Sequence, residues 1–207
     1  MKNNIKNRFI SFEGIDGSGK STQANLLKTK LQLDGYKVKM IHFPRYDTKI
    51  GAIIKDVLFG EIQMDNLALQ MLYIIDQINA KKEIEEGLKE GYVICDRYDL
   101  STLAYTKNII SKDAEKTIKS IQKKLNLLTP DITIILGMNA EEIKSRRKSL
   151  DKIEENIPLL NNINKTYEGY YNNFDILENR KILKINSMLS QELNENLIYS
   201  FVKGVDN

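Results

Sequence analysis

The sequence predicts an α/β fold in which a parallel sheet has helices on both faces. Five short runs rich in β-branched and aromatic residues alternate with longer stretches that show helical periodicity. Several of these runs are continuously apolar, as expected of strands that are covered on both faces. The five runs are residues 8–12, 37–43, 92–96, 132–136 and 181–186.

The chain length and composition predict a single domain spanning residues 1–207. The 207 residues, 42% of them hydrophobic, can bury a full core, and no Pro/Gly/Ser linker or internal repeat divides them. The crossovers between parallel strands should be right-handed, and ligands should gather at the carboxyl ends of the strands. The residues after each predicted strand therefore matter most for function.

A phosphate-binding pattern follows the first predicted strand. Gly14–Ser21 reads G-x-x-x-x-G-K-S, and the stretch 22–32 after it has the leucine spacing of a helix. Glycines let successive N–H groups point at phosphate oxygens, aided by the positive end of the helix. Lys20 would neutralise the β- and γ-phosphates, and the Ser21 hydroxyl would ligate Mg²⁺. The predicted nucleotide-binding residues are Gly14, Gly17, Ser18, Gly19, Lys20, Ser21 and Thr22.

Two later strand exits add cations at the same sheet edge. The second run is followed by Pro44 and Arg45, and Arg45 is a candidate ligand of a second phosphate. The third run ends in Asp96, which could hold Mg²⁺ or its waters, and Arg97 offers a planar fork for the acceptor phosphate. Phosphoryl transfer needs mainly positioning and charge, so His42 at the end of the second run is expected to be structural.

One helix between the second and third runs is predicted from periodicity. Leu67, Met71, Ile74 and Ile78 recur at spacings of four, three and four, which places them on one face of a helix.

Composition and charge exclude several classes of protein. The balance of 31 basic and 28 acidic residues gives a net charge of +3, short of the field expected of a dedicated nucleic-acid binder. The first residues lack the apolar segment of a secretory signal, and no stretch is long enough to span a membrane. The single cysteine, Cys95, is expected in the core and suits a reducing compartment. We therefore expect a cytoplasmic protein that binds neither nucleic acid nor membrane.

Taken together, the motifs resemble those of the thymidylate kinase family. The resemblance rests on FEGIDGSGKSTQ, FPRYDTKIG, LYIIDQ, DRYDLSTLAYT and LDKIEEN, in this order, and covers roughly residues 8–186. It implies a five-stranded P-loop kinase fold, with a short basic lid at about residues 144–157. It also implies transfer of the γ-phosphoryl group of ATP to dTMP, with Mg²⁺, by a protein that is usually a homodimer.

The resemblance also implies roles for single residues. Asp16 would accept a hydrogen bond from the deoxyribose 3′-hydroxyl, and Arg97 would hold the dTMP phosphate. Tyr73 would stack on thymine, and Tyr105 would disfavour a ribose. The implied substrate-binding residues are Asp16, Pro44, Arg45, Tyr73, Gln77, Arg97, Thr102, Tyr105 and Tyr167. The implied catalytic residues are Asp16, Lys20, Arg97, Arg146 and Arg147.

Two positions depart from the family pattern. Gln77 stands where many relatives carry an arginine that donates to thymine O4, and a Gln amide brings one donor but no charge. Gly17 stands where some relatives carry a catalytic arginine after Asp16. The cation for the transferred phosphoryl group must then come from elsewhere, and the segment 144–152 offers Arg146 and Arg147. Lid closure would exclude water.

Two alternatives stay open at this point. Because Gln77 carries no charge, the acceptor could be another nucleoside or nucleoside monophosphate. A P-loop can also belong to a regulatory ATPase that switches a partner. ATP turnover that depends on dTMP would favour the kinase, and turnover without an acceptor would favour the ATPase.

Overall fold

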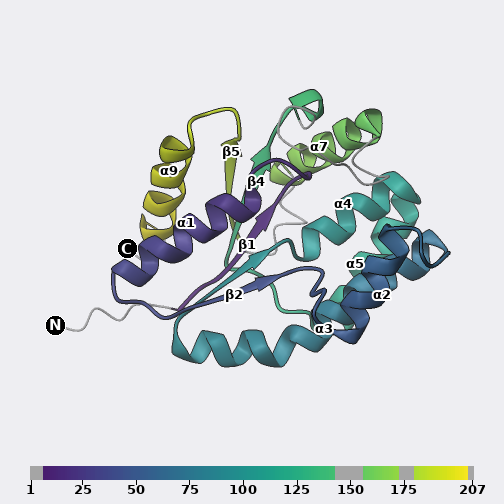
Figure 1. Cartoon of the computed structure of the whole chain (residues 1–207), viewed down its shortest axis with the longest axis horizontal. Coiled ribbons are helices and arrows are strands. Elements are labelled where there is room, and N and C mark those ends of the chain that lie inside the picture. The colour runs from purple at the N-terminus through teal and green to yellow at the C-terminus, as the bar shows by residue number, and fades with distance from the viewer. Residues whose placement is uncertain (1–6, 143–155, 173–179, 205–207) are drawn as a thin grey trace.

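Five parallel strands form one sheet in the order β2-β3-β1-β4-β5 (Figure 1). The computed structural model describes residues 7–142, 156–172 and 180–204. All five predicted strands are confirmed, and so is the fold class. The strands are β1 Phe9–Glu13, β2 Val38–His42, β3 Tyr92–Asp96, β4 Ile132–Gly137 and β5 Lys181–Asn186.

Two helices cover one face of the sheet (Figure 1). They are α1 (Lys20–Leu33) and α9 (Gln191–Gly204), which also contact each other. An apolar cluster lies beneath them and includes Ile10, Phe12 and Ile94, all fully buried. Burial of apolar surface stabilises this face, and an ion pair between Lys30 and Glu195 also joins α1 to α9.

The opposite face carries the longer helices. These are α3 (Asn66–Glu90), α4 (Asp99–Ile109), α5 (Lys112–Lys124) and α7 (Ile157–Tyr171), while α2 (Lys49–Leu58) packs on α3. Two apolar clusters fill this side, one around Ile74 and Leu103 and one around Phe9 and Tyr98. A short 3₁₀ turn, η1, spans Ala140–Glu142 after β4. The sheet is thus covered on both faces, as predicted.

Polar residues before four helices explain where these helices begin. The side chains of Thr48, Asp65, Ser111 and Asn156 each accept a hydrogen bond from a backbone N–H in the first turn of α2, α3, α5 and α7 respectively. Such caps satisfy donors that have no partner inside the helix.

The structure shows how deeply the single cysteine and the apolar stripe of α3 are buried. Cys95 is fully buried, as predicted. The helix predicted from the spacing of Leu67 and Ile74 is confirmed, but Leu67 is 43% exposed whereas Ile74 is fully buried. Leu67 lies in the first turn of α3, whose residues up to Ala68 are all exposed and so lie beyond the packed core. Within the described ranges, no helix is long and apolar enough to cross a membrane.

Candidate active site

The phosphate-binding loop runs from the end of β1 to the start of α1, as the sequence predicts. Gly14, Gly17 and Gly19 have φ values of 141°, 74° and 91°, which disfavour any residue with a Cβ. A Cβ on Gly14 would lie 2.5 Å from the carbonyl oxygen of Leu136. The loop can therefore turn back beside β4 only with glycine at this position.

Lys20 opens α1 with its side chain folded back over the loop. The ammonium donates to the Ile15 carbonyl at 2.8 Å, and the residue is only 5% exposed. Burial lowers the pKa of Lys20 to about 8, and the nearby Arg97 charge adds to this effect. An anionic ligand beside this ammonium would restore its usual basicity.

One carboxylate contacts both cations of the site. Asp16 Oδ1 lies 2.6 Å from a terminal nitrogen of Arg97 and 4.0 Å from the Lys20 ammonium. The other oxygen, Oδ2, accepts from the Tyr105 hydroxyl at 3.3 Å. The loop lysine and the strand-exit arginine therefore contact the same oxygen of Asp16, so two anionic groups bound to them would adjoin.

Arg97 is held in a left-handed backbone conformation directly after β3. Its φ is 66°, its backbone N–H donates to the Phe12 carbonyl, and one guanidinium nitrogen donates to the Gly14 carbonyl at 3.0 Å. The same nitrogen lies 3.3 Å from the Ser101 hydroxyl, and the guanidinium carbon lies 5.6 Å from the centroid of the Tyr105 ring. This cation is fixed by its surroundings before any ligand arrives.

Asp96 joins three elements at the edge of the sheet. One of its oxygens, Oδ2, accepts from the Ser21 hydroxyl and contacts His42 Nδ1 at 3.0 Å. Burial alone would raise the pKa of Asp96, but the hydrogen bond from His42 and the charge of Lys20 outweigh burial and lower it. The carboxylate is therefore ionised at neutral pH.

Ser21 and Asp96 offer an oxygen donor set of the kind Mg²⁺ prefers. The second oxygen of Asp96, Oδ1, is buried and has no hydrogen-bond partner in the part of the chain described. No group of three His, Cys, Asp or Glu side chains within those ranges could hold a metal ion. Mg²⁺ commonly binds through one or two carboxylates together with substrate phosphates, so the two residues fit this ion.

The predicted base-binding residues meet between α3 and α4. Gln77 from α3 donates to the Thr102 hydroxyl of α4 at 3.0 Å, and both side chains are buried. Tyr73 lies one helical turn before Gln77, and Tyr105 lies nearly one turn after Thr102. Tyr167 from α7 is fully buried, and its hydroxyl lies 2.9 Å from that of Ser101.

Arg45 follows a cis peptide bond between Phe43 and Pro44. Its Nε donates to Asp76 at 2.8 Å, its NH2 donates to the Asp76 carbonyl, and its NH1 lies 3.4 Å from Glu83. The Arg45 backbone N–H also donates to Asp76. The structure thus ties this loop to α3 through a carboxylate that the sequence did not single out.

Comparison with known sequences decides the family. A sequence model described as thymidylate kinase matches residues 12–198. The chain belongs to the thymidylate kinase family. The expectation of a phosphotransferase of this family is therefore confirmed.

Individual relatives of the thymidylate kinase family agree. The chain is 38% identical over 151 residues to a probable thymidylate kinase of Methanocaldococcus jannaschii, covering 73% of this chain and 75% of the relative. It is 32% identical over 196 residues to the thymidylate kinase of Plasmodium falciparum, covering 92% and 91%. Among solved structures, thymidylate kinase from Candida albicans superposes with a TM-score of 0.78 at 25% identity, covering 98% of this chain and 93% of that one.

Two residues of the site were missed by sequence reasoning, Glu13 and Ser101. Glu13 is the last residue of β1 and is fully buried, and its Oε2 accepts from the Ser101 hydroxyl at 2.5 Å. Burial raises the pKa of Glu13 to about 8, and the nearby Asp99 charge adds to this effect. The sequence did offer one signal that Glu13 belongs to the site, because this glutamate ends an apolar strand directly before the loop.

The basic lid lies almost entirely outside the described residues. Arg146, Arg147 and the rest of the segment up to residue 155 belong to that part, so their predicted role stays a prediction. Of the predicted lid, only Asn156 and Ile157 are described, and they form the start of α7.

Proposed function

We propose that this protein transfers the γ-phosphoryl group of ATP to dTMP and forms ADP and dTDP. Membership of the thymidylate kinase family supports the reaction. The observation that carries the assignment of the two substrates is that Asp16 Oδ1 contacts both Lys20 and Arg97. A phosphate donor bound at Lys20 and a phosphate acceptor bound at Arg97 would meet with their reacting groups adjacent.

The donor side would bind ATP through the glycine loop. The backbone N–H groups of the loop and the Lys20 ammonium would hold the β- and γ-phosphates. Ser21 and Asp96 would hold Mg²⁺, which would neutralise phosphate charge when bound. His42 would keep the Asp96 carboxylate oriented through its contact at 3.0 Å.

The acceptor side would bind dTMP between α3 and α4. Arg97 would hold its phosphate, and Asp16 would accept from its 3′-hydroxyl. Tyr73 and Thr102 would contact the base, and Tyr105 would crowd the 2′ position of the sugar. Gln77 and Tyr167, both buried beside these residues, would complete the base site, and Pro44 would shape the loop that borders it.

Arg45 remains a proposed ligand of the acceptor phosphate. Its Nε donates to the buried carboxylate of Asp76, whereas its NH1 makes only a long contact with the half-buried Glu83. NH1 could therefore exchange Glu83 for phosphate while the loop stays anchored. Arg146 and Arg147 are proposed to supply the cation for the transferred phosphoryl group, since Gly17 brings none.

We further propose that the protein is a cytoplasmic homodimer. The outer surfaces of α2 and α3 and the loop between them expose five large apolar side chains: Ile53, Phe59, Ile62, Leu67 and Ile75. Exposed apolar side chains that gather on neighbouring elements suit a protein interface. The lone buried Cys95 suits a reducing compartment.

A coupled ADP-release assay tests the reaction. ATP is offered with dTMP, dUMP, UMP, dCMP, AMP or thymidine in turn, and dTMP should give the highest kcat/KM. ADP release that is equal with and without an acceptor would contradict the proposal and favour an ATPase. A different preferred monophosphate would point to Gln77, the uncharged residue at the base site.

Two variants at Arg97 test its role in the same assay. Arg97→Ala should raise the KM for dTMP by about tenfold to a hundredfold, because a charged hydrogen bond contributes about 1.5–3 kcal/mol. Arg97→Lys keeps the charge but loses the fork, so its KM should lie between those of Arg97→Ala and the wild type. An unchanged KM in Arg97→Ala would remove Arg97 from the acceptor site.

A further inference from the structure

A chain of buried polar side chains runs beneath one face of the sheet. Ser11 and Glu13 alternate with the apolar residues of β1 and therefore point to the α4 side. The Ser11 and Thr133 hydroxyls are 2.9 Å apart, and Thr133 lies 3.5 Å from a guanidinium nitrogen of Arg180. The buried polar chain consists of two hydrogen-bonded groups, one of Ser11, Thr133, Arg180 and Asp99 and one of Ser101 and Glu13, with each residue less than 10% exposed. The electrostatic interaction of Asp99 with Glu13 links the two groups.

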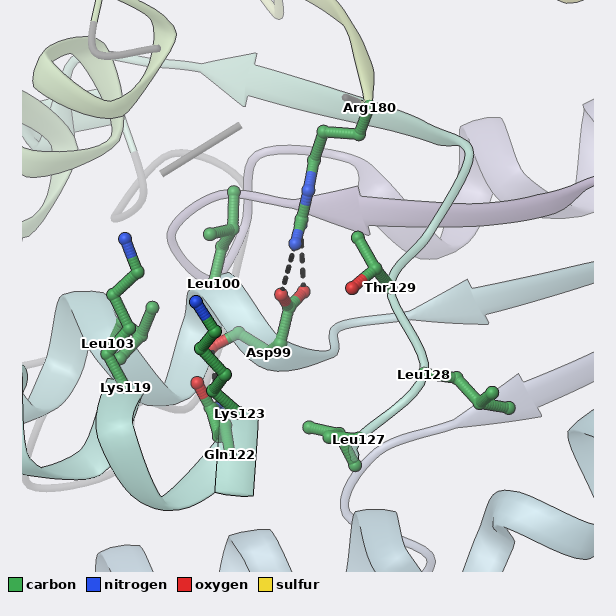
Figure 2. A pocket seen from close by; sticks show the side chains of 10 residues that line it. All are labelled: Asp99, Leu100, Leu103, Lys119, Gln122, Lys123, Leu127, Leu128, Thr129 and Arg180. Atoms are coloured by element: carbon green, nitrogen blue, oxygen red, sulfur yellow. Dashed lines mark hydrogen bonds and ion pairs between the residues drawn. The ribbon is translucent and has the colours of Figure 1, made fainter. Parts of the chain in front are cut away.

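At the end of the buried polar chain away from the glycine loop, Arg180 and Asp99 form an ion pair. Arg180 holds Asp99 with two contacts, at 2.6 and 3.1 Å, and the pair borders a pocket with Lys119 and Lys123 (Figure 2). None of the residues that line this pocket belongs to the phosphate-binding loop. Asp99 is therefore already paired, and Glu13 is the member whose contacts lead toward the active site.

Glu13 reaches the active site through one hydroxyl. Ser101 has a single hydroxyl hydrogen, which it donates to Glu13 at 2.5 Å. Its oxygen can then accept from Arg97 at 3.3 Å and from the Tyr167 hydroxyl at 2.9 Å. Because Ser101 donates to Glu13, its oxygen is available to hold both Arg97 and Tyr167.

We propose that Glu13 is a positioning residue of the acceptor site, where its carboxyl orients the Ser101 hydroxyl and thereby the guanidinium of Arg97 and the hydroxyl of Tyr167. This inference rests on the proposed binding of dTMP phosphate by Arg97. It extends the site to a side chain that makes no contact with the nucleotide itself.

The charge of Glu13 should also affect the acceptor. Six titratable groups surround it. They are Asp99 on α4, Arg97 before α4, Tyr167 of α7, Arg180, Lys20 of α1 and Cys95 of β3. Burial keeps Glu13 protonated at neutral pH, with a pKa of about 8. The neutral acid can still accept from Ser101. Above this pKa, the carboxylate adds negative charge behind Arg97 and opposes the dTMP phosphate.

The test is the KM for dTMP from pH 7 to 9 at saturating ATP, in the wild type, Glu13→Gln and Glu13→Asp. The dTMP phosphate is fully ionised over this range because its second pKa is near 6, and bound ATP keeps Lys20 charged. The wild-type KM should rise roughly tenfold with pH through about 8, since an uncompensated charge at this depth is weakly screened. At each pH, the KM for ATP should be the same in both variants as in the wild type.

The variants separate contact from charge. Glu13→Gln keeps an acceptor for Ser101 but cannot ionise, so its KM for dTMP should stay near the wild-type value at pH 7 throughout. Glu13→Asp keeps the ionisation but withdraws from Ser101, so its KM should be higher than the wild-type value at every pH. Ser11→Ala is the matched control, because Ser11 shares the strand and the burial of Glu13 but contacts Thr133. It should leave the KM for dTMP and its pH profile unchanged.

Three outcomes overturn the inference. Glu13→Gln could keep the wild-type pH profile, or Glu13→Asp could show the wild-type KM at pH 7. Both variants could also lower the melting temperature without changing the KM for dTMP or its pH profile, which would make the role of Glu13 merely structural. If the wild type does not phosphorylate dTMP at all, the proposed function fails first, and this result is distinct from the other three.

Discussion

Strand β1 presents different side chains to the two faces of the central sheet. On the face covered by α1 and α9, Ile10 and Phe12 join a cluster of buried apolar side chains. On the face covered by α3, α4 and α7, the same strand presents Ser11 and Glu13. The alternation of β1 thus places apolar side chains on one face and a hydroxyl and a carboxyl on the other, where the Glu13 carboxyl contacts Ser101 beside Arg97.

The largest expected effect tests whether the polar face also carries stability. Asp99→Ala removes the carboxylate that pairs with Arg180, whose side chain is buried. Breaking a buried pair by removing one partner should lower the free energy of unfolding by about 3–5 kcal/mol. Chemical denaturation measures this change. Lys116→Ala is the control, because it removes an exposed pair with Asp113 and should cost less than about 1 kcal/mol. Equal losses of unfolding free energy in Asp99→Ala and Lys116→Ala would mean that the buried pair adds no more stability than the exposed one.

A core truncation on the apolar face should affect stability alone. Ile198 of α9 is 1% exposed, and Ile198→Ala should lower the free energy of unfolding by about 3 kcal/mol through lost burial and the cavity left behind. The KM values for ATP and dTMP should stay unchanged at a temperature where the variant is folded. Steady-state kinetics and thermal unfolding on the same sample check both. A changed KM for dTMP would mean that the faces are not separate.

The smallest expected effect concerns Lys20, which belongs to α1 but lies at the edge shared by the two faces. Its pKa of about 8 means that the free protein loses this charge as the pH rises through 8. Bound phosphates favour the charged form, so ATP binding above pH 8 requires proton uptake. The affinity should then fall by up to about tenfold per pH unit, or about 1.4 kcal/mol.

Calorimetry at pH 7, 8 and 9 in two buffers measures the affinity and the proton uptake. Lys20→Arg is the control, since arginine keeps its charge over this range and should show a flatter profile. Proton release on ATP binding at pH 9 would refute the assignment.

The strands, and the edge of the sheet at which the glycine loop begins, were predicted correctly for a physical reason. Strand residues and the glycine loop carry local signals, and parallel strands bring their carboxyl ends to one edge whatever the packing. The partners of individual side chains were harder to predict. Arg45 is held by Asp76 and Ser101 by Glu13, and these pairs lie 31 and 88 positions apart. Such contacts depend on how helices dock, which periodicity does not encode.

The exposure of Leu67 has a similar origin. Its spacing matches the buried stripe of α3, but the helix begins before the sheet can cover it. Periodicity identifies the face of a helix, whereas burial also depends on where neighbouring elements end.

The central place of β1 has a consequence for biosynthesis. Its two hydrogen-bonded neighbours, β3 and β4, come about 80 and 120 residues later in the chain. Until β3 has been synthesised, β1 has no neighbouring strand to pair with, and contacts over such distances are slow to form. The loop after β1 reaches its final surroundings, which include the Leu136 carbonyl beside Gly14, only once residue 137 has left the exit tunnel.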